Sequence, residues 1–73
     1  MEKKLIGIFE DILNDNSITL DTDRGSVETW DSLAQIQLIG EIENEFGISF
    51  SFDETDSLCS VRDFYDYIVR AKR

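Results

Sequence analysis

Apolar side chains recur at three- and four-residue intervals in three separate segments, and this spacing constrains the fold more than any other feature. An α-helix has 3.6 residues per turn, so side chains at these intervals lie on one face. The sequence therefore predicts three long amphipathic helices over residues 2–13, over residues 32–46, and from residue 61 into the C-terminal region. Their expected buried faces contain Leu5, Ile8, Phe9, Ile12 and Leu13; Leu38, Ile39, Ile42 and Phe46; and Val61, Phe64, Tyr65 and Ile68.

Polar residues at the predicted helix ends support these boundaries. Asp31 precedes the second segment, where its carboxylate can accept the free backbone N–H groups of the first turn. Gly47 follows that segment, at the position where a left-handed C-terminal cap favours glycine. Ser60 and Asp63 have the spacing of a capping box, with aspartate in place of the usual glutamate. Cations favour the C-terminal end of a helix dipole, and the third segment ends with Arg70, Lys72 and Arg73.

Two connecting segments complete the predicted architecture. In residues 48–59, the capping-box spacing of Ser51 and Glu54 predicts a short helix near Asp53 to Leu58. The preceding ISFSF run alternates like a strand, but no second strand is expected, so we interpret it as an extended connector. Residues 14–31 form a long first loop that Ile18, Leu20, Val27 and Trp30 can attach to the helices. We expect one all-α domain over residues 1–73, a four-helix bundle with three long helices and one short helix.

The charge and the residue types limit the possible functions. The net charge of −9 repels nucleic acid and anionic membranes and favours basic protein partners. The chain has no histidine, which excludes a Ser-His-Asp triad and a histidine metal site. No apolar run approaches the ~20 residues that span a bilayer, so no membrane insertion is expected. The single Cys59 cannot form an internal disulfide, which fits a reducing compartment, so we expect a cytoplasmic protein. We also expect a monomer, and we interpret Cys59 as a small packing residue.

Ser32 is the main candidate for a functional residue. It follows the long loop and opens the second predicted helix, where the positive end of the helix dipole favours a phosphate ester. No neighbouring base would activate Ser32 as a nucleophile, so we interpret it as a residue on which another enzyme acts. At about 100° per residue, Leu33 and Ile36 point away from the predicted core face. Two apolar side chains on an exposed face beside Ser32 indicate a docking patch for partners.

The tripeptide Asp31-Ser32-Leu33 resembles the D-S-L motif of acyl carrier proteins. The resemblance continues without a gap to Ile68 and includes the run ENEFGISF. It implies a non-catalytic carrier whose Ser32 receives 4′-phosphopantetheine from coenzyme A through a separate magnesium-dependent phosphopantetheinyl transferase. The thiol of that arm would hold an acyl group as a thioester, and Asp31 would help the transferase to position the metal and the serine. Leu33 and Ile36 would contact the transferase and the enzymes that load and transfer the acyl group.

The sequence also departs from the fatty-acid carriers of this family. These carriers commonly have glycine two residues before the motif aspartate, where this chain has Thr29. On the outer face of the second helix, Gln37 and Asn44 are neutral at two positions that tend to be acidic. The acidic residues that remain there, and that would face basic partner surfaces, are Glu41, Glu43 and Glu45. Within fatty acid or polyketide biosynthesis as a broad class, the resemblance therefore favours a dedicated carrier of a specialised pathway over the housekeeping fatty-acid carrier.

Two alternatives fit the same sequence. A carrier for an amino acid or a peptide, such as a D-alanyl carrier, would have the same fold and the same arm but a different cargo. An acidic helical interaction module without a prosthetic group would account for the charge and for the exposed apolar patch. That module would not account for a serine at the helix start beside the patch.

Overall fold

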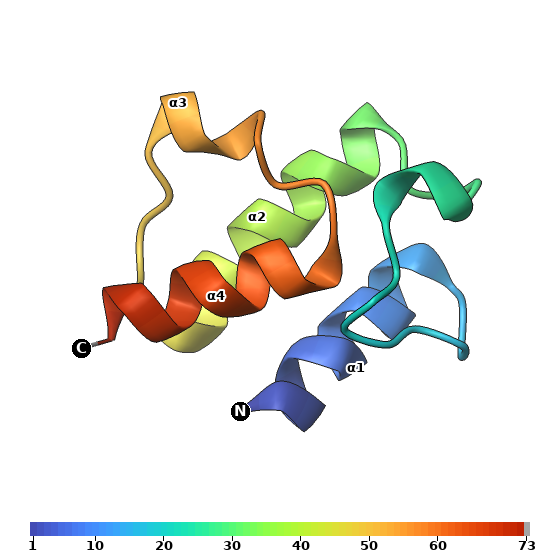
Figure 1. The fold of residues 1–73 in the computed structure, drawn as a ribbon, viewed down its shortest axis with the longest axis horizontal. Coiled ribbons are helices and arrows are strands. Elements are labelled where there is room, and N and C mark those ends of the chain that lie inside the picture. Colours follow the sequence, from blue (N-terminus) through green and yellow to red (C-terminus); the bar gives the residue numbers. More distant parts are fainter. Residues whose placement is uncertain (73) are drawn as a thin grey trace.

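The computed structural model describes residues 1–72, apart from the side chain of Phe52, and shows a helical bundle (Figure 1). The elements in chain order are α1 (Glu2–Leu13), a 3-10 turn η1 (Arg24–Ser26), α2 (Ser32–Phe46), α3 (Phe52–Thr55) and α4 (Val61–Ala71). Helix α1 packs against both α2 and α4. The three long helices and the short fourth helix confirm the predicted all-α architecture; Arg73, which was expected at the cationic end of α4, lies outside the described residues.

The predicted caps are present at both ends of α2 and at the start of α4. The Ala34 N–H donates to Asp31 Oδ1 at 2.8 Å, and Gly47 adopts a left-handed conformation with φ of 65°. Ser60 and Asp63 form the reciprocal hydrogen bonds of a capping box. Because these contacts involve residues close in sequence, they fix the helix ends independently of the rest of the fold.

The core is a single apolar cluster in which aromatic rings meet edge to face. Phe9 lies at the centre, with ring centroids 5.3 Å from Trp30 and 5.2 Å from Phe64. Phe50 also packs on Phe64, at 5.6 Å. The aliphatic members include Leu5, Leu13, Leu38, Ile42, Val61 and Ile68, all fully buried. The faces expected from the apolar spacing are therefore the faces that form the core, with Ile8, Ile12, Ile39 and Tyr65 partly buried at its margin.

The long first loop is attached at both of its flanks, which explains how residues 14–31 keep a defined path. The Thr29 hydroxyl donates to the carbonyl of Leu13 at 2.7 Å, next to the end of α1. The backbone N–H groups of Val61 and Arg62 donate to loop carbonyls, each at 3.0 Å. Arg62 also forms an ion pair with Asp21 at 2.8 Å. These contacts therefore hold the loop that leads into the start of α2 in a defined position.

Two expectations for the segment before α4 need correction. Helix α3 covers Phe52–Thr55, so it begins and ends earlier than predicted. The carbonyls of Thr55 and Leu58 accept hydrogen bonds from a side chain of α2, and Leu58 turns into the core. Cys59, expected to be a packing residue, is exposed because it follows this inward turn. None of the helices described within residues 1–72 has the length and the apolar composition that would let it cross a bilayer.

Candidate functional site

Ser32 is the first residue of α2, and its side chain is exposed. The residue before it, Asp31, is extended (φ −98°, ψ −171°), and Trp30 before that is buried. The indole Nε1 of Trp30 donates to Gln35 Oε1 at 2.6 Å while its ring packs on Phe9. This anchor fixes the point at which the loop becomes helix, and it confirms the packing role expected for Trp30. Ser32 is thereby held at the surface, two residues after the buried Trp30.

Gln35 is a buried polar residue of this region that the sequence analysis did not single out. Its Oε1 accepts from the Trp30 indole N–H, and its Nε2 donates to the carbonyls of Thr55 and Leu58 at 3.3 and 3.1 Å. It thus connects the loop before Ser32 and helix α2 with the end of α3 and the segment that follows it. The signal was present in the helical register, because Gln35 lies three residues before the core residue Leu38 and on the same face.

An open hollow of about 210 Å³ lies beside Ser32. Its walls come from η1, α2 and the α3 segment, and include Arg24, Ser32, Ile36 and Asp56. Arg24 is half-buried, and its Nε donates to the carbonyl of Trp30 at 3.4 Å. The sequence did not connect Arg24 with Ser32, because the loop path between them depends on contacts with distant parts of the chain.

Leu33 and Ile36 are strongly exposed, at 66% and 67%. They lie on α2 on the side away from the core residues Leu38 and Ile42. The predicted exposure of this apolar pair is therefore confirmed. Burial of such side chains is favourable, so their exposure beside Ser32 leaves an apolar surface open to a partner.

The acidic residues of α2 differ in their surroundings. Glu41 is exposed, and its side chain takes part in neither of the ion pairs found among residues 1–72. Glu43 is half-buried, and its Oε2 accepts from the Phe50 N–H at 2.8 Å. Glu45 forms an ion pair with Lys4 at 2.9 Å. Glu43 therefore has a structural contact, to the connector after α2, that the sequence did not predict.

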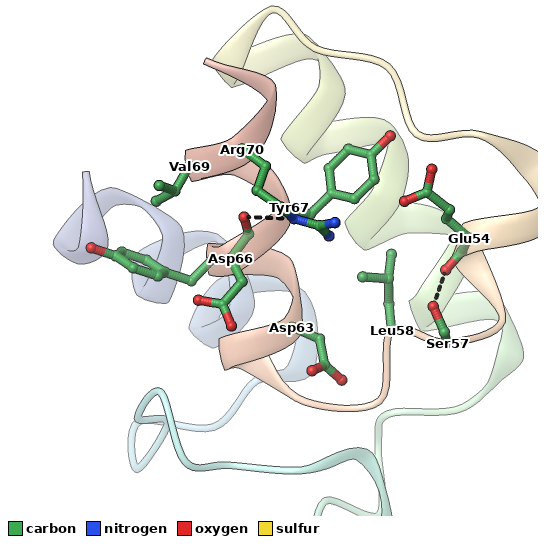
Figure 2. Close-up of a pocket in the computed structure, with 9 residues that line it drawn as sticks. Glu54, Ser57, Leu58, Asp63, Asp66, Tyr67, Val69 and Arg70 are labelled. Carbon is green, nitrogen blue, oxygen red and sulfur yellow. Dashed lines mark hydrogen bonds between the residues drawn. The ribbon is translucent and has the colours of Figure 1, made fainter. Parts of the chain in front are cut away.

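A larger hollow of about 530 Å³ lies along α4, away from the predicted site residues (Figure 2). Its walls include Leu58, Tyr67 and Arg70, and the Arg70 Nε donates to the Asp66 carbonyl at 3.4 Å. Neither Ser32 nor the exposed apolar pair contributes to it. The two hollows are thus separate features of the surface.

A phosphate ester fits the surroundings of Ser32. The hydroxyl is exposed at the N-terminus of a 15-residue helix, where the first backbone N–H groups point toward an anion. Asp31 occupies only the Ala34 N–H with its side chain. Arg24 lines the same hollow as Ser32 and supplies a positive charge there. The first turn of α2 and Arg24 could hold such a group without any rearrangement of the core.

Comparisons with known proteins give a consistent result. Residues 3–68 match the family model described as phosphopantetheine attachment site. An acyl carrier protein of Chloroherpeton thalassium is 34% identical over 68 residues, which cover 93% of this chain and 79% of that protein.

Solved structures of the same kind superpose on the chain at 30% identity. One is assigned as an acyl carrier protein of Mycobacterium tuberculosis; it has a TM-score of 0.86, and the match covers 94% of this chain and 95% of that one. Another is the holo acyl carrier protein of Geobacter metallireducens, with a TM-score of 0.83 and coverage of 94% and 82%. The chain therefore belongs to the acyl carrier protein family, the non-catalytic carriers that bear a covalently attached 4′-phosphopantetheine group and serve partner enzymes.

Proposed function

We propose that this protein holds an acyl group as a thioester on a 4′-phosphopantetheine arm attached to Ser32, in a dedicated biosynthetic pathway. The observation that carries the proposal is the position of Ser32, exposed at the start of α2 beside an apolar pair that the fold leaves uncovered. Ser32 supplies the hydroxyl that is modified. The transferase supplies the base, since the chain contains no histidine.

Asp31 fits two roles in this proposal. Its Oδ1 accepts the Ala34 N–H and so begins helix α2 immediately at Ser32. Its side chain is exposed, and the second carboxylate oxygen is available to the magnesium ion that the transferase brings. Asp31 would therefore both place the serine and help the transferase to recognise it.

The docking surface in this proposal consists of Leu33, Ile36 and Glu41, which we call the docking patch. Leu33 and Ile36 provide apolar anchors, and exposed Glu41 favours a partner with a basic surface. Glu43 contributes charge to the same helix, but its carboxylate also holds the Phe50 backbone. We further propose a monomer, because a net charge of −9 opposes self-association. The single Cys59, which cannot form an internal disulfide, supports a reducing compartment such as the cytoplasm.

The dedicated pathway is proposed from differences at the surface around the site. Thr29 stands where fatty-acid carriers commonly have glycine, and its hydroxyl bonds to Leu13, a contact that glycine cannot make. Gln37 and Asn44 are exposed and neutral on α2. A partner that binds this face of α2 would therefore contact fewer negative charges than it would on a fatty-acid carrier.

Modification of Ser32 is directly testable. Incubation of the protein with coenzyme A, magnesium and a promiscuous phosphopantetheinyl transferase should increase its intact mass by one phosphopantetheine group. Ser32→Ala should abolish the increase, because the attachment atom is removed. Ser51→Ala is the matched control, since Ser51 is also exposed and precedes a helix, and this variant should be modified like the parent. A mass increase that persists in Ser32→Ala would contradict the proposal.

A further inference from the structure

We propose that Arg24 binds the phosphodiester of the arm on Ser32, within the hollow between η1, α2 and the α3 segment. This inference rests on the proposed attachment at Ser32 and adds a binding partner for the arm. Both residues line the same hollow of about 210 Å³. A phosphate on Ser32 Oγ is only one bond away from that oxygen, so its position is limited to the immediate surroundings of the serine.

Two hydrogen bonds, one from its side chain and one from its backbone, hold Arg24 in place. Its Nε donates to the carbonyl of Trp30, two residues before Ser32. Trp30 itself is buried and holds Gln35 through its indole N–H, so this carbonyl is a well-anchored acceptor. The backbone N–H of Arg24 adds a second tie, since it donates to the Cys59 carbonyl at 2.7 Å. The guanidinium therefore stays beside the start of α2.

The positive charge of Arg24 is not committed to a carboxylate of the described chain. The two ion pairs found within residues 1–72 join Lys4 to Glu45 and Arg62 to Asp21. Next to Arg24 in sequence, Asp23 accepts the Ser26 N–H at 3.0 Å and so caps η1. Asp56 also lines the hollow but forms no ion pair with Arg24. A guanidinium has five N–H donors, and Nε uses one of them on Trp30, so the terminal amino groups can face the hollow.

A phosphodiester is the ligand that this arrangement suits. Guanidinium groups bind phosphate oxygens through paired, charge-assisted hydrogen bonds. The added group carries a negative charge, and the rest of the chain, at a net charge of −9, opposes it. Arg24 supplies a local positive charge at the point of attachment, so it should offset that repulsion in the holo form.

A comparison of apo and holo forms tests this role without any activity assay. The parent, Arg24→Gln, Arg24→Lys and Arg70→Gln are converted to the holo form, and intact mass with peptide mapping confirms one group on Ser32. Arg70→Gln is the matched control: its Nε also donates to a backbone carbonyl at 3.4 Å, and it lines the other hollow (Figure 2). The melting temperatures of both forms are then measured at about 0.05 M and about 1 M NaCl.

Holo conversion should lower the melting temperature of Arg24→Gln by about 2–4 °C more than that of the parent, as expected for loss of one partly exposed ion pair in a small domain. Arg70→Gln should respond like the parent, and Arg24→Lys should lie between. The extra loss should shrink at about 1 M NaCl. An equal fall in melting temperature for Arg24→Gln and Arg70→Gln would overturn the proposed role of Arg24 but would leave the attachment at Ser32 standing. A parent that is not modified at Ser32 would instead overturn the attachment, and this inference with it.

A second measurement on the unaltered chain covers the case in which Arg24→Gln folds poorly. In the ¹⁵N spectrum of the parent, holo conversion should shift the side-chain Nε–H signal of Arg24 clearly more than that of Arg70. Equal or absent shifts would show that the guanidinium does not contact the phosphodiester, and would overturn the inference.

Discussion

Leu33 and Ile36 are exposed to solvent at a cost, since burying a side chain of this kind is worth about 1.5–3 kcal/mol. Nothing in the bundle requires them, because the core of α2 is completed by Leu38, Ile42 and Phe46. Their place beside Ser32 is the basis of the proposal that they serve binding rather than folding.

Substitution of Leu33 or Ile36 by glutamine should separate these two roles. The free energy of unfolding should change by less than ~0.5 kcal/mol, because the side chains contact little of the folded chain. The rate of modification by a transferase should fall at least about fivefold, since an apolar anchor at a docking site is worth ~1 kcal/mol or more. Thermal unfolding and transferase kinetics are measured on the same samples.

The buried Leu38→Gln is the control for damage to the core and should unfold far below the parent. If Leu33→Gln and Ile36→Gln unfolded like Leu38→Gln, the two residues would belong to the core. Parental stability together with parental kinetics would show that Leu33 and Ile36 do not bind the transferase.

At the scale of elements, the start of α2 combines a structural cap with a proposed functional carboxylate in the single residue Asp31. Asparagine caps a helix about as well as aspartate, whereas alanine does not. Substitution of the same residue in these two ways can therefore distinguish the roles.

Asp31→Ala should lower the free energy of unfolding by ~0.5–2 kcal/mol, because the Ala34 N–H loses its acceptor. Asp31→Asn should stay within a few tenths of a kcal/mol of the parent, since the cap is retained. Both variants should be modified slowly if the transferase uses the negative charge. Urea unfolding and mass-detected modification give the two readouts. Parental modification of Asp31→Asn would leave Asp31 with the role of a cap only.

The long helices were predictable from sequence because their signals are local. Apolar spacing and caps such as Asp31 and Ser60 act within a few residues, and the bounds of α1 and α2 follow from them. Helix α3 was placed less well because its end depends on Gln35, which bonds to carbonyls 20 and 23 residues further along the chain. The same applies to the site. Ser32, Leu33 and Ile36 follow from the register of one helix, whereas Arg24 reaches the hollow through a loop path that only the fold determines.

For the whole molecule, stability depends on a small number of aromatic contacts. At ~0.05–0.15 kcal/mol per residue, a domain of 73 residues has a free energy of unfolding of about 4–11 kcal/mol. Phe64 is fully buried and packs on Phe9, Trp30 and Phe50, so it joins α4, α1, the loop and the connector. One side chain therefore links four parts of the chain.

Phe64→Ala should lower the free energy of unfolding by ~3–5 kcal/mol, the usual cost of removing a buried phenylalanine. Tyr65→Ala is the control on the same helix; Tyr65 is half-buried at the margin of the core, so its loss should be clearly smaller. Urea unfolding followed by Trp30 fluorescence measures both, because the indole packs against the Phe64 ring. Losses of equal size would contradict the central position of Phe64.

The bonding of Gln35 also limits how this chain can change over time. The indole of Trp30 can only donate, and the carbonyls of Thr55 and Leu58 can only accept, so the residue between them must both accept and donate while uncharged. Glutamate would lack the donor. Leucine would remove the partner of the Trp30 indole N–H and of the Leu58 carbonyl, whereas the Thr55 carbonyl would still accept the Leu58 N–H. Replacement of Gln35 should thus be tolerated only together with a change at Trp30, and among related carriers the two positions should vary as a pair.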